Sequence, residues 1–322
     1  METSLDRVRG MFMGAFLGDA LGAPHEFRCN AQVPYTGILE HAPFMTTRWQ
    51  GTKYLKVGQV TDDSEMTITL LRSLLRNQRY HRDDVISSYL TWANTPGTML
   101  GKNTRALLKG VTTLKGYSNR IAKIHALPMT ERTQSNGGLM RCSSLALLFD
   151  NEPVIQDISI TNPNNVCIDC NLVYVTALRL ALQGVPGRDI VNRIVPLAQT
   201  PEVREVIAHA QAYTARNLRE NKGWCLHALW ISLVVIQHFV DYSQALAYIM
   251  NCGGDTDTNA CIAGALLGAS LGFDHLQTEE STAKNIQILL SVNSEDEPTP
   301  RRKEYSPHDF YSLTEQAYML TK

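Results

Sequence analysis

Glycine recurs at every fourth position in two segments near opposite ends of the chain. The first series is Gly10, Gly14, Gly18 and Gly22, and the second is Gly264, Gly268 and Gly272. On a helix this spacing places each series on nearly one face, where another backbone can approach closely. Glycine in a helix costs about 1 kcal/mol relative to alanine, so each series needs a structural reason. We favour tight packing in a soluble core over dimerisation in a membrane, with the polar ends of both helices brought together.

The remaining sequence is dominated by helical periodicity, and alternation of the strand type does not persist for long. Val203, Ile207, Ala210 and Tyr213 follow the spacing of one helix face. The pattern therefore predicts an all-α fold, a compact single-domain helical bundle. The expected helices are 4–21, 64–78, 82–94, 102–110, 138–149, 169–183, 187–195, 201–220, 224–239, 241–250, 257–272 and 275–291.

Three stretches lack this periodicity: 28–60, 114–136 and 292–307. The first two are long for a compact domain, and loops of that length usually have a function or are disordered. We expect 28–60 to border a binding cleft. No domain boundary or repeat is evident, so residues 1–322 are interpreted as one domain, with 292–322 as a loop and a C-terminal tail.

Composition excludes several classes of protein. The formal net charge is −1, so no basic excess indicates a nucleic-acid surface. The most apolar runs are shorter than the roughly 20 residues needed to cross a bilayer. The seven cysteines are irregularly spaced, and the pair Cys167 and Cys170 lacks two further ligands for zinc. We expect a cytoplasmic protein with reduced thiols and leave its oligomeric state open.

Two acidic clusters each precede an expected helix. Thr61, Asp62, Asp63 and Ser64 form the first cluster, and helix capping is an equally good explanation for it because Asp62 with Glu65 fits a capping box.

The second cluster is the run GGDTDT at 253–258. Its two glycines permit a sharp turn, after which Asp255 and Asp257 can converge on one point. Capping needs one acid, not two with flanking threonines. Hard oxygen ligands of this kind suit Mg²⁺, Mn²⁺ or Ca²⁺ better than zinc, and the two clusters together could hold two divalent ions.

Three further features carry polar groups. Pro24 should end the first glycine-rich helix and leave Glu26 in a rigid turn, where it could be a metal ligand, a proton carrier or a solvated acid. Asp19 lies within the glycine series, and a buried Asp must be paired, so it could orient a ligand or cap a neighbouring helix. The run SNGGLMR at 135–141 is typical of an anion-binding helix entrance or an ordinary turn, and Arg141 could pair with an acid of the fold.

Four short motifs follow one another along the chain. They are G-x-x-x-G-D-A at 14–20, T-D-D-S-x-M at 61–66, N-G-G-x-M-R at 136–141 and G-G-D-T-D-T at 253–258. In this order they resemble the ADP-ribosylglycohydrolase family, which includes the dinitrogenase reductase-activating glycohydrolase and the ADP-ribosyl-acceptor hydrolases. Each motif is modest alone, but the ordered set is specific.

The resemblance implies an all-α hydrolase with two Mg²⁺ or Mn²⁺ ions in a cleft at helix N-termini. Its substrate would be an ADP-ribosylated protein or other acceptor, cleaved at the N- or O-glycosidic bond to C1 of the distal ribose. The metal ligands implied are Thr61, Asp62, Asp63, Asp255, Asp257 and Thr258. The catalytic residues implied are Glu26 and Asp62. The substrate-binding residues implied are Asn136, Gly137, Gly138 and Asn162.

The chain departs from the family pattern at Asn162, where the family often has His. Asn donates a hydrogen bond but does not titrate near neutral pH, so we expect this departure to affect substrate affinity and not metal binding. The identity of the acceptor, the choice between Mg²⁺ and Mn²⁺, and the acid that activates water stay open.

Two other functions fit the sequence less well. An all-α diphosphate lyase or synthase would carry its paired acids in mid-helix, three residues apart, whereas this chain has Asp-x-Asp after glycines. A non-catalytic ADP-ribose-binding or crystallin-like structural relative would tend to lose metal ligands. Because all the acids are present, catalysis is the favoured interpretation.

Overall fold

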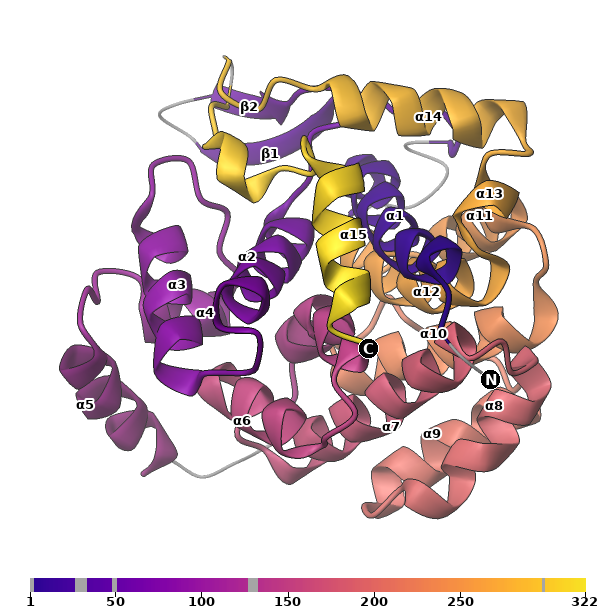
Figure 1. The fold of residues 1–322 in the computed structure, drawn as a ribbon, viewed down its shortest axis with the longest axis horizontal. Helices are drawn as coiled ribbons and strands as arrows, with labels where there is room; N and C mark the ends of the chain where they lie inside the picture. The colour runs from indigo at the N-terminus through magenta and orange to yellow at the C-terminus, as the bar shows by residue number, and fades with distance from the viewer. Residues whose placement is uncertain (1–2, 27–33, 48–50, 127–132, 297–298) are drawn as a thin grey trace.

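The structure is a computed structural model and describes residues 3–26, 34–47, 51–126, 133–296 and 299–322. The elements in chain order are α1 (Leu5–Gly22), η1 (Ala23–His25), β1 (Ala42–Thr47), β2 (Gly51–Leu55), α2 (Asp62–Asn77), α3 (Arg82–Asn94), α4 (Lys102–Leu108), α5 (Leu114–His125), η3 (Asn136–Leu147), α6 (Glu152–Thr161), α7 (Asn165–Leu182), α8 (Gly187–Ile194), η4 (Val195–Leu197), α9 (Pro201–Gln211), α10 (Cys225–His238), α11 (Tyr242–Cys252), α12 (Thr256–Leu271), α13 (Phe273–Leu276), α14 (Glu280–Ser291), η5 (Lys303–Tyr305) and α15 (Phe310–Met319). The expected all-α fold is confirmed, and Figure 1 shows the helices assembled into one compact unit.

The helices α1 and α12 form the centre of this unit, as expected from the two glycine series (Figure 1). A Cβ atom at Gly10 would overlap the backbone of Gly268, and one at Gly22 would overlap that of Asp257. The start of α1 therefore lies beside the end of α12, and the two helices run antiparallel. This packing brings the end of α1 to the N-terminus of α12, where the second acidic cluster begins.

Side chains at the ends of α1 fix its length. The Ser4 hydroxyl caps its N-terminus by accepting a hydrogen bond from the Arg7 N–H at 3.2 Å. At the other end Pro24 lies in the short 3₁₀ turn η1, and Glu26 follows it in a turn. The sequence prediction that Pro24 leaves Glu26 in a turn is confirmed.

The structure differs from the sequence-based assignment in several segments. The stretch 28–60 contains the antiparallel hairpin β1–β2, and 114–136 contains α5, which Thr113 caps by accepting a hydrogen bond from the Gly116 N–H at 3.1 Å. Helix α6 was not expected from the periodicity. The segment expected as a helix at 138–149 is the 3₁₀ helix η3, because periods of 3.0 and 3.6 are hard to separate over so few residues.

The C-terminal segment is part of the packed body of the protein. Helix α15 contacts both α1 and α2, and in Figure 1 it lies across them. Helix α7 is long and apolar enough to meet the length and composition test for a membrane span, but 67% of that window is buried inside the fold. The core helix of a soluble protein passes the same test.

Candidate metal and substrate site

Asp19 anchors the N-terminus of α2 to α1. Its carboxylate is fully buried and accepts hydrogen bonds from the backbone N–H groups of Thr61, at 3.0 Å, and Ser64, at 3.1 Å. It also accepts hydrogen bonds from both hydroxyls, at 2.7 Å for Thr61 and 2.5 Å for Ser64. Asp19 thus satisfies donors that a helix start otherwise leaves unpaired. These bonds fix the direction in which the side chains of Asp62 and Asp63 project from the start of α2.

Helix capping does not account for the first acidic cluster. The N-cap of α2 is Thr61, and the expected capping box between Asp62 and Glu65 is not formed. Instead, Glu65 pairs with Arg301 and with the indole of Trp92. Asp62 and Asp63 are therefore left to face the space between α1, α2 and α12.

The second acidic cluster lies at the start of α12, after a turn made by two glycines. Gly253 and Gly254 have φ values of 71° and 88°, a left-handed region that favours glycine. Asp255 occupies the N-cap position but makes no side-chain capping bond, and its Oδ2 accepts a hydrogen bond from Asn136 Nδ2 at 2.8 Å. Asp257 accepts a hydrogen bond from the backbone N–H of Thr258 at 2.8 Å.

The carboxylates converge in two groups that share one member. Asp19, Asp63 and Asp257 have oxygens within 4.8 Å of one another, and so do Glu26, Asp255 and Asp257. Asp257 thus lies where two cation sites would meet. The structure brings together the acids that the sequence places some 190 residues apart, from Asp63 to Asp255.

Burial and mutual repulsion raise the pKa values of the acids in the protein without metal. Burial, followed by the charges of Asp255 and Asp62, raises the pKa of Glu26 to about 8. Burial, followed by the charges of Asp19 and Glu65, raises the pKa of Asp62 to about 7. The pKa of Asp257 is also raised well above its ordinary range, first by burial and then by Glu26. Divalent cations would remove this mutual repulsion.

The donor set fits divalent cations. The Asp63 Oδ1 atom is buried and accepts no hydrogen bond of good geometry, although buried polar atoms are nearly always paired. The surrounding groups are carboxylate and hydroxyl oxygens, which suit Mg²⁺ or Mn²⁺. The residues that would hold such ions are the members of the two carboxylate groups.

A cavity of about 830 Å³ opens above the acids. Its walls come from the turn that follows α1, the starts of α2, α12 and η3, and the loop before α4 with the first turn of that helix. The residues expected from the sequence that line it are Glu26, Thr61, Asp62, Asp63, Asn136, Gly137, Asp255, Asp257 and Thr258. Leu55 at the end of β2 also lines it, so the hairpin within 28–60 reaches the cleft as expected.

Two residues expected to bind substrate lie behind the cavity wall. Gly138 is buried, and a Cβ atom there would overlap the side chain of Ile158, so it serves close packing. Asn162 is 2% exposed and donates a hydrogen bond to the Ser135 hydroxyl at 2.7 Å. Asn162 therefore supports the loop that carries Asn136 and does not line the cavity.

Arg141 is a structural residue of the fold. Its fully buried guanidinium donates to Asp157 Oδ2 at 2.9 Å, to the Gly137 carbonyl at 2.7 Å and to the Thr161 hydroxyl at 2.8 Å. It therefore pairs with an acid of the fold, as the sequence allowed, and holds the backbone of the loop that lines the cavity.

The site also has a basic part, which no motif of the sequence indicated. Lys102 and Lys222 line both the main cavity and a neighbouring hollow of about 350 Å³, which also includes Trp224. Ser135 and Gly223 lie at the junction of the two hollows. The sequence offered little to find these lysines, since single lysines in polar surroundings are common on any surface.

Comparisons with known proteins agree with this geometry. A sequence model of the ADP-ribosylglycohydrolase family matches residues 1–285. The ADP-ribosyl-(dinitrogen reductase) glycohydrolase of Rhodospirillum rubrum is 27% identical over 308 residues, 89% of this chain and 96% of that protein. The ADP-ribosylhydrolase ARH3 of Danio rerio is 22% identical over 327 residues, 84% of each chain. A solved structure described as an ADP-ribosylglycohydrolase-related protein complex shares the fold, with a TM-score of 0.74 at 22% identity over 99% of both chains. The chain therefore belongs to the ADP-ribosylglycohydrolase family and is a hydrolase.

Proposed function

We propose that this protein uses two divalent cations, Mg²⁺ or Mn²⁺, to hydrolyse the glycosidic bond at C1 of the distal ribose in an ADP-ribosylated acceptor. The observation that carries the proposal is that two clusters of three acids each have Asp257 as a common member. The buried and unsatisfied Asp63 Oδ1 supports it independently. When bound, the ions would hold ribose hydroxyls and offset the charge of the acids.

The carboxylates have a second role in the proposed reaction. Positive charge develops near C1 as the bond to the acceptor breaks, and acids close to that carbon stabilise it. Glu26 and Asp62 both line the cavity, and either carboxylate could take a proton from the attacking water. Comparison of Glu26→Gln with Asp62→Asn separates them, because the residue that takes the proton shapes the pH profile of kcat.

The basic part of the cavity fits the rest of the substrate. The diphosphate of an ADP-ribosyl group is anionic, and Asn136 and Gly137 bring backbone at the start of η3 to the cavity wall. Lys102 and Lys222 add positive charge on both sides of the junction between the hollows. The substrate would extend from the acids, past Asn136, toward Trp224.

An ADP-ribosylated protein is the proposed acceptor class, because the relative from Rhodospirillum rubrum is named for one. We also propose a cytoplasmic location, which is consistent with the free cysteines among the described residues. Cys29, the seventh cysteine, lies outside those residues.

The proposal is tested by incubating the protein with a panel of defined ADP-ribosyl linkages, arginine, serine and acidic side chains among them, with Mg²⁺ or Mn²⁺. We expect release of free ADP-ribose, dependent on metal, from at least one linkage. ADP-ribose binding without release from any linkage would instead support a non-catalytic relative. Release that persists after complete metal removal would reject the metal-dependent mechanism.

A further inference from the structure

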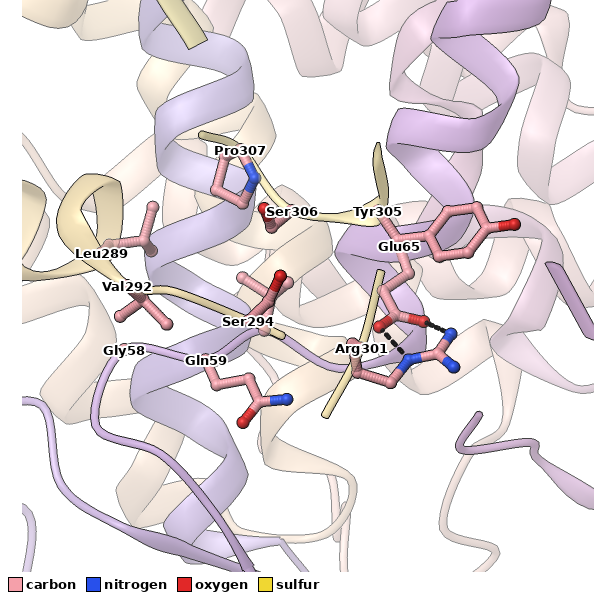
Figure 2. Close-up of a pocket in the computed structure, with 11 residues that line it drawn as sticks. Gly58, Gln59, Glu65, Leu289, Val292, Ser294, Arg301, Tyr305, Ser306 and Pro307 are labelled. Atoms are coloured by element: carbon pink, nitrogen blue, oxygen red, sulfur yellow. Dashed lines mark hydrogen bonds and ion pairs between the residues drawn. The ribbon is translucent and has the colours of Figure 1, made fainter. Parts of the chain in front are cut away.

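Arg301 is a buried cation in the segment that follows α14, beyond the residues matched by the family model. It is 3% exposed, whereas its neighbour Arg302 is exposed. Figure 2 shows the guanidinium of Arg301 directed at the carboxylate of Glu65 on α2. A buried charge of this kind needs both a counter-charge and a full set of hydrogen bonds.

The first set of contacts reaches the helix that carries the metal-site acids. Arg301 Nε donates to Glu65 Oε1 at 2.7 Å, and a terminal nitrogen donates to Oε2 at 2.5 Å. The indole of Trp92 donates to the same Oε2 at 2.7 Å. Glu65 lies three residues after Asp62, so this pair is one turn of α2 away from the acids.

The second set of contacts reaches a wall of the cavity. The other terminal nitrogen of Arg301 shares its two hydrogens among three acceptors: the Pro96 carbonyl at 2.6 Å and the hydroxyls of Thr95, at 2.9 Å, and Thr98, at 2.8 Å. The loop at 95–101 joins α3 to α4, and residues 97–101 of it line the cavity. One guanidinium therefore connects two walls of the site.

The contacts of Arg301 are not needed merely to attach the C-terminal segment to the rest of the fold. Arg72 on α2 already binds Asp309 just before α15 through two hydrogen bonds, at 2.7 and 3.0 Å. Neither residue lines the cavity. A buried ion pair contributes little net stability compared with apolar packing, but its bonds are directional and specify one geometry.

We propose that Arg301 is a positioning residue, which fixes the 95–101 loop relative to α2 and thereby sets the affinity of the cavity for its substrate. The expected effect on substrate affinity rests on the proposed function, whereas the expected effect on the geometry of the loop does not. The C-terminal segment thus completes the cleft from outside the region matched by the family model.

The test is Arg301→Lys, with Arg72→Lys as the matched control. Lysine keeps the charge beside Glu65, but one ammonium group cannot donate to both Glu65 and the Pro96 carbonyl in the same fork geometry. We expect KM for the ADP-ribosyl substrate to rise about tenfold, as for one lost charge-assisted hydrogen bond, with kcat and metal affinity nearly unchanged. Hydrogen exchange should become faster in 95–101. The control should leave KM and this exchange as in the wild type.

Two results would overturn the proposal: wild-type KM and wild-type loop exchange in Arg301→Lys, or the same changes in Arg72→Lys. If Arg301→Lys does not fold, Thr95→Val is the second variant, since it removes at constant size the hydroxyl that accepts from Arg301 and also bonds the Trp92 carbonyl and the Thr98 hydroxyl. Thr95 lies away from the cavity lining, and loss of its hydroxyl should raise both loop exchange and KM by a smaller factor. Absence of such effects in Thr95→Val would equally contradict it. Loop exchange is measured without substrate, so failure of the proposed reaction would not be mistaken for failure of this inference.

Discussion

Asp257 has the most demanding position among the acids, because its oxygens lie near those of two other carboxylates on each side. It is 5% exposed, and its carboxylate accepts a hydrogen bond from the backbone N–H of Thr258 at 2.8 Å. That bond does not offset burial and the repulsion from Glu26 and Asp255, which raise the pKa of Asp257. The proposed role as a shared metal ligand would account for this environment, whereas a helix cap would not.

We predict that Asp257→Asn yields a folded protein with greatly weakened metal binding and turnover. Asn keeps the size of the side chain and caps helices well, but it removes a negative charge between two proposed cations. The loss in metal affinity should be about 100-fold or more, since even groups outside the ligand shell typically contribute 10–100-fold. Calorimetric metal titration and ADP-ribose release should be measured on one preparation.

The control is Asp83→Asn, which changes an exposed acid in the first turn of α3. It alters the same kind of helix position without touching the cavity and should behave as the wild type. Retention of both metal affinity and turnover in Asp257→Asn would reject Asp257 as a metal ligand.

At the scale of elements, the site depends on the close approach of α1 and α12. The backbone of Gly14 lies against that of Gly264, with no room for a Cβ atom between them. The hydroxyl of Tyr242 on α11 donates to the Gly14 carbonyl at 2.6 Å and fixes a third helix against this pair. Separation of the two helices would move Asp19 away from Asp257.

Gly14→Ala should therefore lower the free energy of unfolding by at least about 2 kcal/mol, because overpacking of a rigid core typically costs 1–3 kcal/mol. Metal affinity should fall as well, since the two helices carry acids of the same site. Urea unfolding and metal titration measure the two effects. Gly116→Ala in α5, whose nearest neighbours are side-chain atoms, should change stability by less than about 1 kcal/mol. Equal effects of the two substitutions would contradict the packing argument.

At the scale of the whole molecule, charge is divided between an acidic floor and a basic rim. Lys102 and Lys222, called the basic rim here, line the same cavity as five acids, called the acidic floor. With two dications on the acids, the floor would be close to neutral, and the rim would then dominate the attraction of an anionic ligand.

We predict that Lys102→Ala and Lys222→Ala each raise KM for an ADP-ribosyl substrate several-fold and weaken its dependence on salt concentration. Metal affinity should not change, because neither lysine lies among the acids. Lys115→Ala, an exposed lysine of α5, is the control. Unchanged KM and unchanged salt dependence in both rim variants would rule out this role.

The acids of the cavity also predict how the stability of the protein without metal depends on pH. In the protein without metal the pKa values of Asp19, Asp62 and Glu26 are raised to about 6, 7 and 8, mainly by burial. Unfolded carboxyls titrate near 4, so the folded state without metal binds more protons than the unfolded state between about pH 4 and pH 8. Stability without metal must therefore decrease as the pH rises through this window.

Calorimetry in the presence of chelator or of Mn²⁺ checks this prediction at both ends of the window. The rise in Tm caused by Mn²⁺ should be larger near pH 8 than near pH 5, since the acids are charged at the higher pH. An equal rise at both pH values would show that these carboxylates do not bind the ion.

Local pattern was sufficient to predict much of the fold and the acids of the site. Helix α3 was expected at 82–94 and spans Arg82–Asn94. The glycine series predicted the α1–α12 contact, and both acidic clusters line the cavity. Each of these features depends on the spacing of residues within one segment, and that spacing can be read from the sequence alone.

Only the tertiary structure decided which polar residues serve the site and which serve the fold. Arg301 and Arg302 are adjacent in sequence, yet one is buried beside Glu65 and the other is exposed. Asn162 matched a substrate-binding position, but its hydrogen bond to Ser135 places it behind the cavity wall. Burial and pairing depend on contacts between residues far apart in the chain, and no local spacing encodes the sum of those contacts.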